Sequence, residues 1–119
     1  MTSSFHIFVR FADGASRHTQ NVAFVAWFIY HSGELVSSKG ICLGSATNNM
    51  AEYHVIIRLL IEASYLGITH LIINLDSQLM VYQLNRDYVV HNLVLLRLNL
   101  RVCRLKISFE FIQYRHISR

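Results

Sequence analysis

The chain has 119 residues and a mass of 13.8 kDa, which is enough for one domain with a real core but not for two ordinary domains. Hydrophobic residues make up 53% of it and charged residues 15%, so a disordered chain is excluded. The net charge is +4 and nine of the eleven basic residues are arginines, a balance that suits a phosphate-rich partner but is shared by many other proteins.

The first 43 residues predict three strands. Residues 5–11 form a largely apolar run that stops at Ala12-Asp13-Gly14, where a turn is expected. Two further runs rich in β-forming residues, 22–30 and 35–43, are joined by a short link that contains glycine and is of hairpin type. These runs predict an antiparallel meander.

The rest of the chain predicts three helices and two strands. Apolar residues recur at helical spacing over 49–66, and Gly67 is a natural C-terminal cap. The later predicted elements are a strand at 70–75, a short helix at 77–85, a helix at 92–105 and a strand at 108–114. A meander followed by βαβ units predicts an α/β fold, with a mixed five-stranded sheet and helices packed on it.

The compartment is expected to be intracellular, either cytoplasm or nucleus. The longest apolar run, 22–30, is far shorter than the roughly 18 residues of a membrane-spanning helix. The first residues lack the basic start and long apolar stretch of a signal peptide. Cys42 and Cys103 have no partner at metal-ligand or redox-motif spacing, which predicts two buried, reduced thiols.

Three acidic residues each have a simple structural explanation. Asp13 stands before Gly14 in a common turn dipeptide. Glu52 follows Asn49 by three residues, which resembles a capping box. Asp76 could be the N-cap of the short helix that begins at 77. Taken singly, none of the three requires a function.

Their joint placement in the predicted fold favours a shared site. Asp13 ends the first strand, Asp76 ends the strand after the long helix, and Glu52 lies near the start of that helix. If the two strands are parallel neighbours, both aspartates emerge at the same sheet edge, where open α/β folds place their ligands. Clustered carboxylates repel one another unless a cation neutralises them, and ligation by oxygen alone suits Mg²⁺ or Mn²⁺. A divalent metal site is therefore expected.

The strings FADGAS, TNNMAEY and LDSQLMVYQLN, in this order and near these separations, resemble the three signature motifs of the type 1 ribonuclease H family. The likeness is strongest to the ribonuclease H domains of reverse transcriptases from plant Ty3/gypsy-type retrotransposons. It extends from Phe5 to Arg119, so it implies a ribonuclease H-like fold for practically the whole chain. Each motif alone is weak, but the ordered set is specific.

The resemblance also implies a site and an activity. Asp13, Glu52 and Asp76 would be the catalytic carboxylates, holding two Mg²⁺ or Mn²⁺ ions for hydrolysis of the RNA strand in an RNA/DNA hybrid. Six residues would contact the hybrid through its minor groove and 2′-hydroxyls. They are Gly14, Ala15, Ser16, Asn48, Asn49 and Gln78.

The sequence departs from the family pattern in one respect that matters for activity. Members of the family carry a fourth carboxylate on a C-terminal helix beyond the segment similar to 114–119, so residues 1–119 are expected to form a single domain that lacks this C-terminal segment. The alternative to an active enzyme is therefore a catalytically impaired binding or scaffold module of a retroelement polyprotein. A third possibility is an integrase-like or resolvase-like nuclease acting on DNA, against which TNNMAEY speaks.

Overall fold

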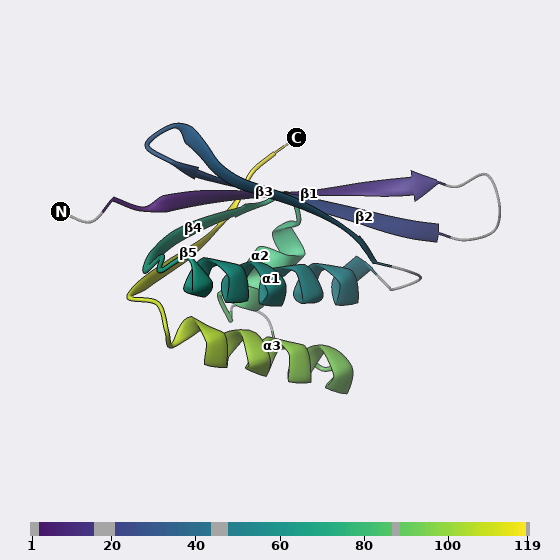
Figure 1. Cartoon of the computed structure of the whole chain (residues 1–119). Coiled ribbons are helices and arrows are strands. Elements are labelled where there is room, and N and C mark those ends of the chain that lie inside the picture. Colours follow the sequence, from purple (N-terminus) through teal and green to yellow (C-terminus); the bar gives the residue numbers. More distant parts are fainter. Residues whose placement is uncertain (1–2, 16–20, 44–47, 87–88, 119) are drawn as a thin grey trace.

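The computed structural model describes residues 3–15, 21–43, 48–86 and 89–118, with the side chains of 11–15, 21–23, 43 and 48 excepted. Three strands come first, and three helices and two further strands follow them, as the sequence predicts (Figure 1). In chain order the elements are β1 (Phe5–Ala15), β2 (Asn21–His31), β3 (Glu34–Leu43), α1 (Asn48–Tyr65), β4 (His70–Leu75), α2 (Gln78–Leu84), α3 (Leu93–Lys106) and β5 (Phe111–His116).

The strands form one mixed sheet in the order β3-β2-β1-β4-β5. The first three strands pair antiparallel, whereas β4 pairs parallel with both β1 and β5. This arrangement confirms the predicted five-stranded sheet, with a meander followed by parallel strands. The central pair, β1 and β4, is also the pair that the sequence analysis expects to carry the two aspartates.

The predicted bounds of the first and last strands are wrong. Strand β1 does not stop at residue 11, because its ladder with β2 continues through Asp13, opposite Ala23, to Ala15. Strand β5 begins at Phe111 rather than at 108, because the amide of Phe109 still donates to the carbonyl of Lys106 in the final turn after α3. Alternating apolar residues at 107 and 109 therefore belong to a helix end.

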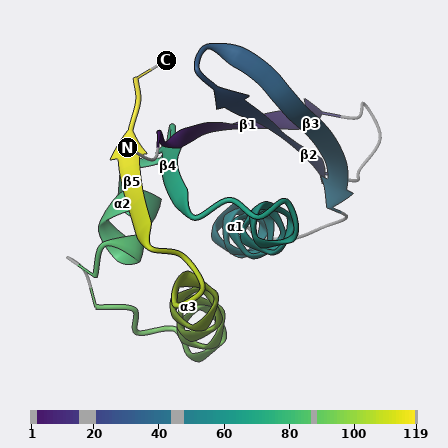
Figure 2. The same ribbon diagram turned by 60° about the vertical axis from the view of Figure 1, so that its left-hand side comes forward.

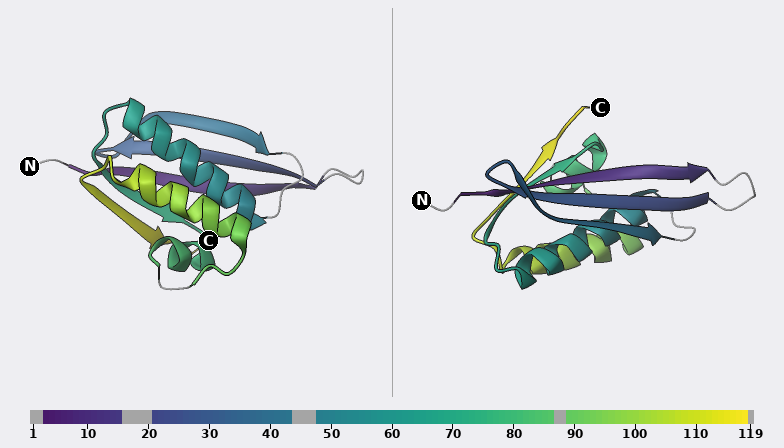
Figure 3. Two further views of the ribbon diagram at one scale, coloured as in Figure 1. Left: turned by 90° about the horizontal axis from the view of Figure 1, so that it is seen from below. Right: turned by 45° about the horizontal axis from the view of Figure 1, so that its top comes forward.

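The core lies between the sheet and α1. Inward-facing residues alternate along the strands, among them Ile7, Val9 and Trp27, each at most 2% exposed. Helices α1 and α3 lie on the same side of the sheet (Figures 2 and 3). Both Trp27 and the apolar side of α1 are buried, so the tryptophan is a core residue.

Helix α1 ends where glycine allows it to end. Gly67 has φ +75°, a left-handed conformation that costs other residues more. The amide of Ile68 donates to the carbonyl of Ala63 at 3.0 Å and that of Gly67 to the carbonyl of Ser64 at 3.1 Å. These two bonds form a Schellman motif, which confirms the predicted cap and directs the chain back into β4.

Two expectations about composition have different outcomes. No helix within the described ranges is long and apolar enough to cross a membrane. Both cysteines are free, but Cys42 is exposed on the edge strand β3 and Cys103 is only partly buried, so the prediction of two buried thiols is wrong for Cys42. An edge strand exposes side chains that an apolar sequence context alone suggests are buried.

Candidate functional site

Glu52 is a buried carboxylate near the start of α1. Glu52 is only 8% exposed, and its Oε2 has no hydrogen-bond partner in the part of the chain that the structure describes. The pKa of Glu52 is raised from 4.5 to about 7, mainly by burial, while a hydrogen bond with the Ser77 side chain lowers it and the charge of Asp76 raises it. Glu52, Asp76 and Ser77 therefore form one polar group inside the fold.

Asp76 and Ser77 follow β4 directly, at the carboxyl end of a central parallel strand. Ser77, not Asp76, is the N-cap of α2: its backbone is extended, and its Oγ accepts a hydrogen bond from the amide of Met80 at 3.3 Å. The capping explanation for Asp76 is thus wrong. Asp76 lies directly after β4, at the end of the sheet where the parallel strands finish, and its charge acts on Glu52.

The capping explanation for Glu52 also fails. Helix α1 begins at Asn48, so Asn49 is already its second residue and Glu52 its fifth. A capping box requires the acid at the third helical position, with the N-cap residue just before the helix. A helix cap therefore does not account for the carboxylate of Glu52 at this buried position.

Asp13 lies in the ladder of β1, and its side chain is outside the described part of the structure. The parallel pairing of β1 with β4 runs from Phe5 opposite Leu71 to Phe8 opposite Asn74. At that register Asp76 would be level with Arg10, and Asp13 would lie three residues farther along, roughly 10 Å at about 3.3 Å per residue. The meeting of Asp13 with Glu52 and Asp76 stays a prediction.

The predicted hybrid-contacting residues lie around the same end of the sheet, in part outside the described structure. Gly14 and Ala15 are the last two residues of β1, and Ser16 falls outside the described residues. Asn48 and Asn49 open α1, and Asn49 is partly buried. Gln78 opens α2 as an exposed side chain that donates to the Tyr82 hydroxyl at 2.9 Å. None of these placements tests a contact with nucleic acid.

The chemistry of the group fits a hard divalent cation. Glu52 and Asp76 offer carboxylate oxygens only, which are the ligands that Mg²⁺ and Mn²⁺ prefer. The unpartnered Oε2 of Glu52 is a buried acceptor that lacks a positive partner, and a cation beside Asp76 would supply it. Counting only side chains that the structure describes, no three acidic, histidine or cysteine residues converge on one point. Glu52 and Asp76 are thus a pair to which Asp13 would have to be added.

Ser77 is a residue of this group that the sequence analysis did not single out. Its hydroxyl accepts from the Met80 amide and hydrogen bonds the Glu52 carboxylate, so it joins the start of α2 to α1. A serine immediately after a strand and before a helical run is a recognisable N-cap signal. Its second partner could not be read from that signal, because Glu52 is 25 residues earlier in the chain.

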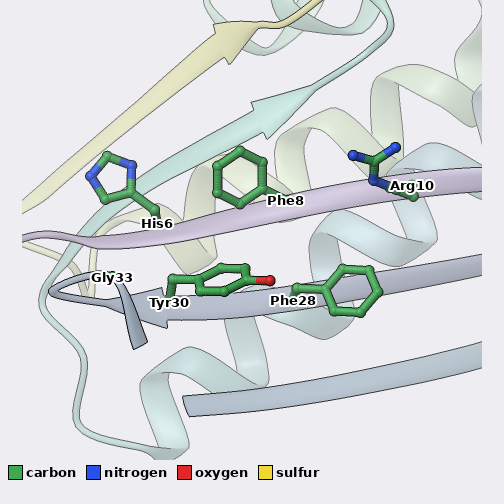
Figure 4. A pocket seen from close by; sticks show the side chains of 6 residues that line it. All are labelled: His6, Phe8, Arg10, Phe28, Tyr30 and Gly33. Atoms are coloured by element: carbon green, nitrogen blue, oxygen red, sulfur yellow. The ribbon is translucent and has the colours of Figure 1, made fainter. Parts of the chain in front are cut away.

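Two hollows elsewhere do not include the carboxylate pair. One, of about 600 Å³, lies on the face of the sheet that carries Phe8, Phe28 and Tyr30, with Arg10 and His6 beside them (Figure 4). The other, of about 700 Å³, lies between the edge strand and α1, near Trp27 and Tyr65. Three arginines of α3, Arg97, Arg101 and Arg104, are exposed, as arginine side chains usually are.

Comparison with known proteins identifies the family. A family model described as "Reverse transcriptase-like" matches residues 11–119. The crystal structure of RNase H1 from the halophilic archaeon Halobacterium salinarum superposes with a TM-score of 0.83 and 32% identity, over 98% of this chain and 86% of that one. This chain belongs to the ribonuclease H family.

Two similar curated proteins are longer than this chain. A bifunctional protein of Mycobacterium tuberculosis is 37% identical over 111 residues, which are 91% of this chain and 30% of that protein. A ribonuclease HI of H. salinarum is 33% identical over 108 residues, which are 90% of this chain and 54% of the relative. The chain therefore spans about half or less of these relatives. The LC11 RNase H1, crystallised with an RNA/DNA hybrid, has a TM-score of 0.82 at 24% identity and supports the ribonuclease H fold.

Proposed function

We propose that this protein is a metal-dependent endonuclease that hydrolyses the RNA strand of RNA/DNA hybrids. The observation that carries the proposal is the buried Glu52 carboxylate, which has an unpartnered Oε2 and lies beside Asp76. A buried, ionised carboxylate lowers the stability of the fold unless a cation binds to it. Membership in a family that includes ribonucleases H supplies the substrate class.

Asp13, Glu52 and Asp76 are the proposed ligands, and Mg²⁺ or Mn²⁺ is the proposed cofactor. When bound, a pair of such ions would activate the attacking water and stabilise the leaving 3′ oxygen. Glu52 must be ionised to act as a ligand, and the hydrogen bond from Ser77 favours that form against the effect of burial. The cap formed by Ser77 holds Asp76 at the junction between β4 and α2.

The hybrid would be recognised by residues around the carboxylates. We assign Gly14, Ala15 and Ser16 at the end of β1, together with Asn48, Asn49 and Gln78 at the starts of α1 and α2, to contacts with the minor groove. Of these side chains, Gln78 is exposed and beside Ser77 in sequence. The 2′-hydroxyl is the feature by which such contacts would distinguish the RNA strand from DNA.

The finer origin of the domain is also part of the proposal. Its motifs are most similar to those of reverse transcriptases from plant Ty3/gypsy-type retrotransposons. With that origin, the rest of the polyprotein would be its partner. The domain would then act in the cytoplasm or the nucleus. A likeness to the protease-reverse transcriptase of prototype foamy virus, with a TM-score of 0.71 and 14% identity, supports the fold alone. Residues 1–119 would act as a single ribonuclease H-like domain.

A second candidate is a module of the same fold that binds nucleic acid or serves as a scaffold without cleaving. One observation favours it: among the side chains with described positions, only two carboxylates, Glu52 and Asp76, are brought together. Two carboxylates hold one divalent ion less tightly than the larger set typical of a two-metal centre. This candidate predicts hybrid binding that does not depend on added metal.

Cleavage of a labelled RNA/DNA hybrid distinguishes the two candidates. The protein is incubated with Mg²⁺ and, separately, with Mn²⁺, beside RNA/RNA and DNA/DNA duplexes of the same sequence and beside Asp13→Asn. The proposal expects cleavage of the hybrid's RNA strand alone, lost in the variant and in excess chelator. Retention of hybrid in a binding assay with no cleavage under either metal would reject the enzyme and leave the binding module.

A further inference from the structure

Three helices meet at a cluster of buried polar side chains next to the carboxylate pair. The hydroxyl of Tyr53 on α1 donates to Oε1 of Gln83 on α2 at 2.9 Å. Nδ2 of Asn99 on α3 lies 3.2 Å from the Tyr53 hydroxyl and 3.3 Å from the backbone carbonyl of Gln83, to both of which it donates. We call Tyr53, Gln83 and Asn99 the interhelix network.

All three members of the interhelix network are in the interior. Tyr53 is 0% exposed, Asn99 5% and Gln83 9%. Polar side chains at such positions cost stability unless their hydrogen bonds are made, and apolar residues of similar volume would hold the helices together at least as well. Stability alone therefore does not account for the network. What polar groups add is a fixed geometry, since each hydrogen bond specifies a distance and a direction.

The network fixes the elements that carry the candidate site. Tyr53 follows Glu52 directly in α1, so holding its hydroxyl also fixes the turn that bears the carboxylate. Gln83 lies near the end of α2, the seven-residue helix whose N-cap, Ser77, bonds Glu52. A helix this short has little stability of its own. It is held at its start by Ser77 and near its end by Gln83.

We propose that Tyr53, Gln83 and Asn99 are positioning residues that set the separation of Glu52 from Asp76 by tying the end of α2 to α1 and α3. The inference rests on the proposed function only in taking the carboxylate pair as a metal site. Asn99 bonds both other members, so α3 acts on the pair without contributing a carboxylate. Around metal sites, residues that orient the ligands typically account for a tenfold to hundredfold difference in metal affinity or activity.

The test replaces the whole network by apolar groups, in the variant Tyr53→Phe/Gln83→Leu/Asn99→Leu. Removing all partners together leaves few unsatisfied groups, so the free energy of unfolding should stay close to that of the natural chain. The carbonyl of Gln83 keeps a donor, because the amide of Arg86 also bonds it at 3.1 Å. The control is Ile29→Val, a core change on β2 that costs about 1 kcal/mol and removes no hydrogen bond of the interhelix network.

Two measurements are made without substrate. Hydrogen exchange is followed at the amides of Met80 and Val81, which bond the side chain and the carbonyl of Ser77. Mn²⁺ binding is followed by calorimetry at fixed pH. The positioning role predicts faster exchange at both amides and Mn²⁺ affinity weaker by about tenfold or more in the apolar variant. The Ile29→Val control should match the natural chain in both.

Each outcome decides the question. Exchange and Mn²⁺ affinity equal to those of the natural chain, in an apolar variant of equal stability, would show that the network only fills the core and would overturn the inference. If the natural chain binds no Mn²⁺, the metal site of the proposed function fails, and exchange at the start of α2 still decides whether the network positions it. If the triple variant does not fold, Tyr53→Phe alone is judged by the same two readouts.

Discussion

Helix α1 carries two glutamates, and the structure treats them differently. Both carboxylate oxygens of Glu62 have hydrogen-bond donors: Oε2 accepts from the indole Nε1 of Trp27 at 2.8 Å, and Oε1 accepts from the Ser37 hydroxyl at 3.1 Å. The ammonium of Lys39 lies 3.6 Å from the same Oε1. Glu52, ten residues earlier, has Ser77 as a donor and Asp76 as a neighbour of like charge, while its Oε2 has no partner among the described groups.

The difference separates two uses of a carboxylate on one helix. At Glu62 donors and a cation surround the charge, which is what a structural acid needs in a partly buried position. At Glu52 burial and a neighbouring negative charge oppose ionisation and Oε2 has no partner among the described groups, which suits a carboxylate that binds a cation. Amino-acid identity and helical position do not distinguish the two glutamates. Their partners, which come from other elements, do.

Cleavage activity should show the largest contrast between the two glutamates. Glu52→Gln removes a proposed metal ligand, so hydrolysis of an RNA/DNA hybrid should fall on the order of a hundredfold or more. Glu62→Gln keeps an acceptor for Trp27 and lies at the other end of α1, so its rate should stay within about threefold of the natural chain, a change worth less than about 1 kcal/mol. Initial rates on a labelled hybrid in Mg²⁺ measure both. Equal losses would mean that Glu52 has no special role.

The order reverses for stability when the side chains are truncated. Glu62→Ala leaves the indole N–H of Trp27, a residue 2% exposed, without its acceptor, so the free energy of unfolding should fall by about 2–3 kcal/mol. Glu52→Ala removes an unfavourable buried charge together with one hydrogen bond, and should cost less at pH 8 in chelator. Urea unfolding of both variants checks the order, which a larger loss for Glu52→Ala would contradict.

The pH dependence of stability should also distinguish Glu52. Its pKa is raised from 4.5 to about 7, so the folded chain binds more protons than the unfolded chain between these values. The free energy of unfolding should therefore fall as pH rises from about 4.5 through about 7, by roughly 1–2 kcal/mol after allowance for solvent screening. Thermal unfolding in chelator should show that Glu52→Gln removes this fall. The exposed Glu34→Gln is the control, and an unchanged pH profile in Glu52→Gln would refute the assignment.

The smallest effects concern two buried tyrosines, Tyr53 of the interhelix network and Tyr114 of β5. Tyr53→Phe removes a hydroxyl with two partners and should destabilise the protein by about 1 kcal/mol. The hydroxyl of Tyr114 has no partner among described groups, and its burial raises the pKa of that tyrosine, so Tyr114→Phe should be neutral or slightly stabilising. Parallel urea titrations decide. A loss in Tyr114→Phe as large as in Tyr53→Phe would indicate an unrecognised partner for Tyr114.

Much of the fold was predictable from local patterns. Alternating apolar residues located the strands, and apolar residues at helical spacing located α1. Gly67 located the end of α1, because the cap there needs a left-handed backbone. The positions of Glu52 near the start of α1 and of Asp76 directly after β4 were predicted in the same way. Each of these inferences uses information within about one element of the chain.

What could not be predicted depends on contacts between distant elements. Strand β1 runs on to Ala15 because β2 continues to pair with it, whatever the turn preference of Asp13-Gly14. The donors of Glu62 come from β2 and β3, and the interhelix network joins side chains of three different helices. In sequence, Tyr53 and Gln83 read as ordinary members of helical stripes. Their polar atoms acquire a role only once α1, α2 and α3 are packed together.

Metal binding tests the central claim most directly. Calorimetric titration of Mn²⁺ into the natural chain, Glu52→Gln and Glu62→Gln, at pH 8 and without nucleic acid, compares the two carboxylates with no requirement for turnover. If Glu52 and Asp76 form a cation site, the natural chain and Glu62→Gln should bind alike and Glu52→Gln should bind at least about tenfold more weakly. Equal binding by all three proteins, or no binding by any, would contradict the account.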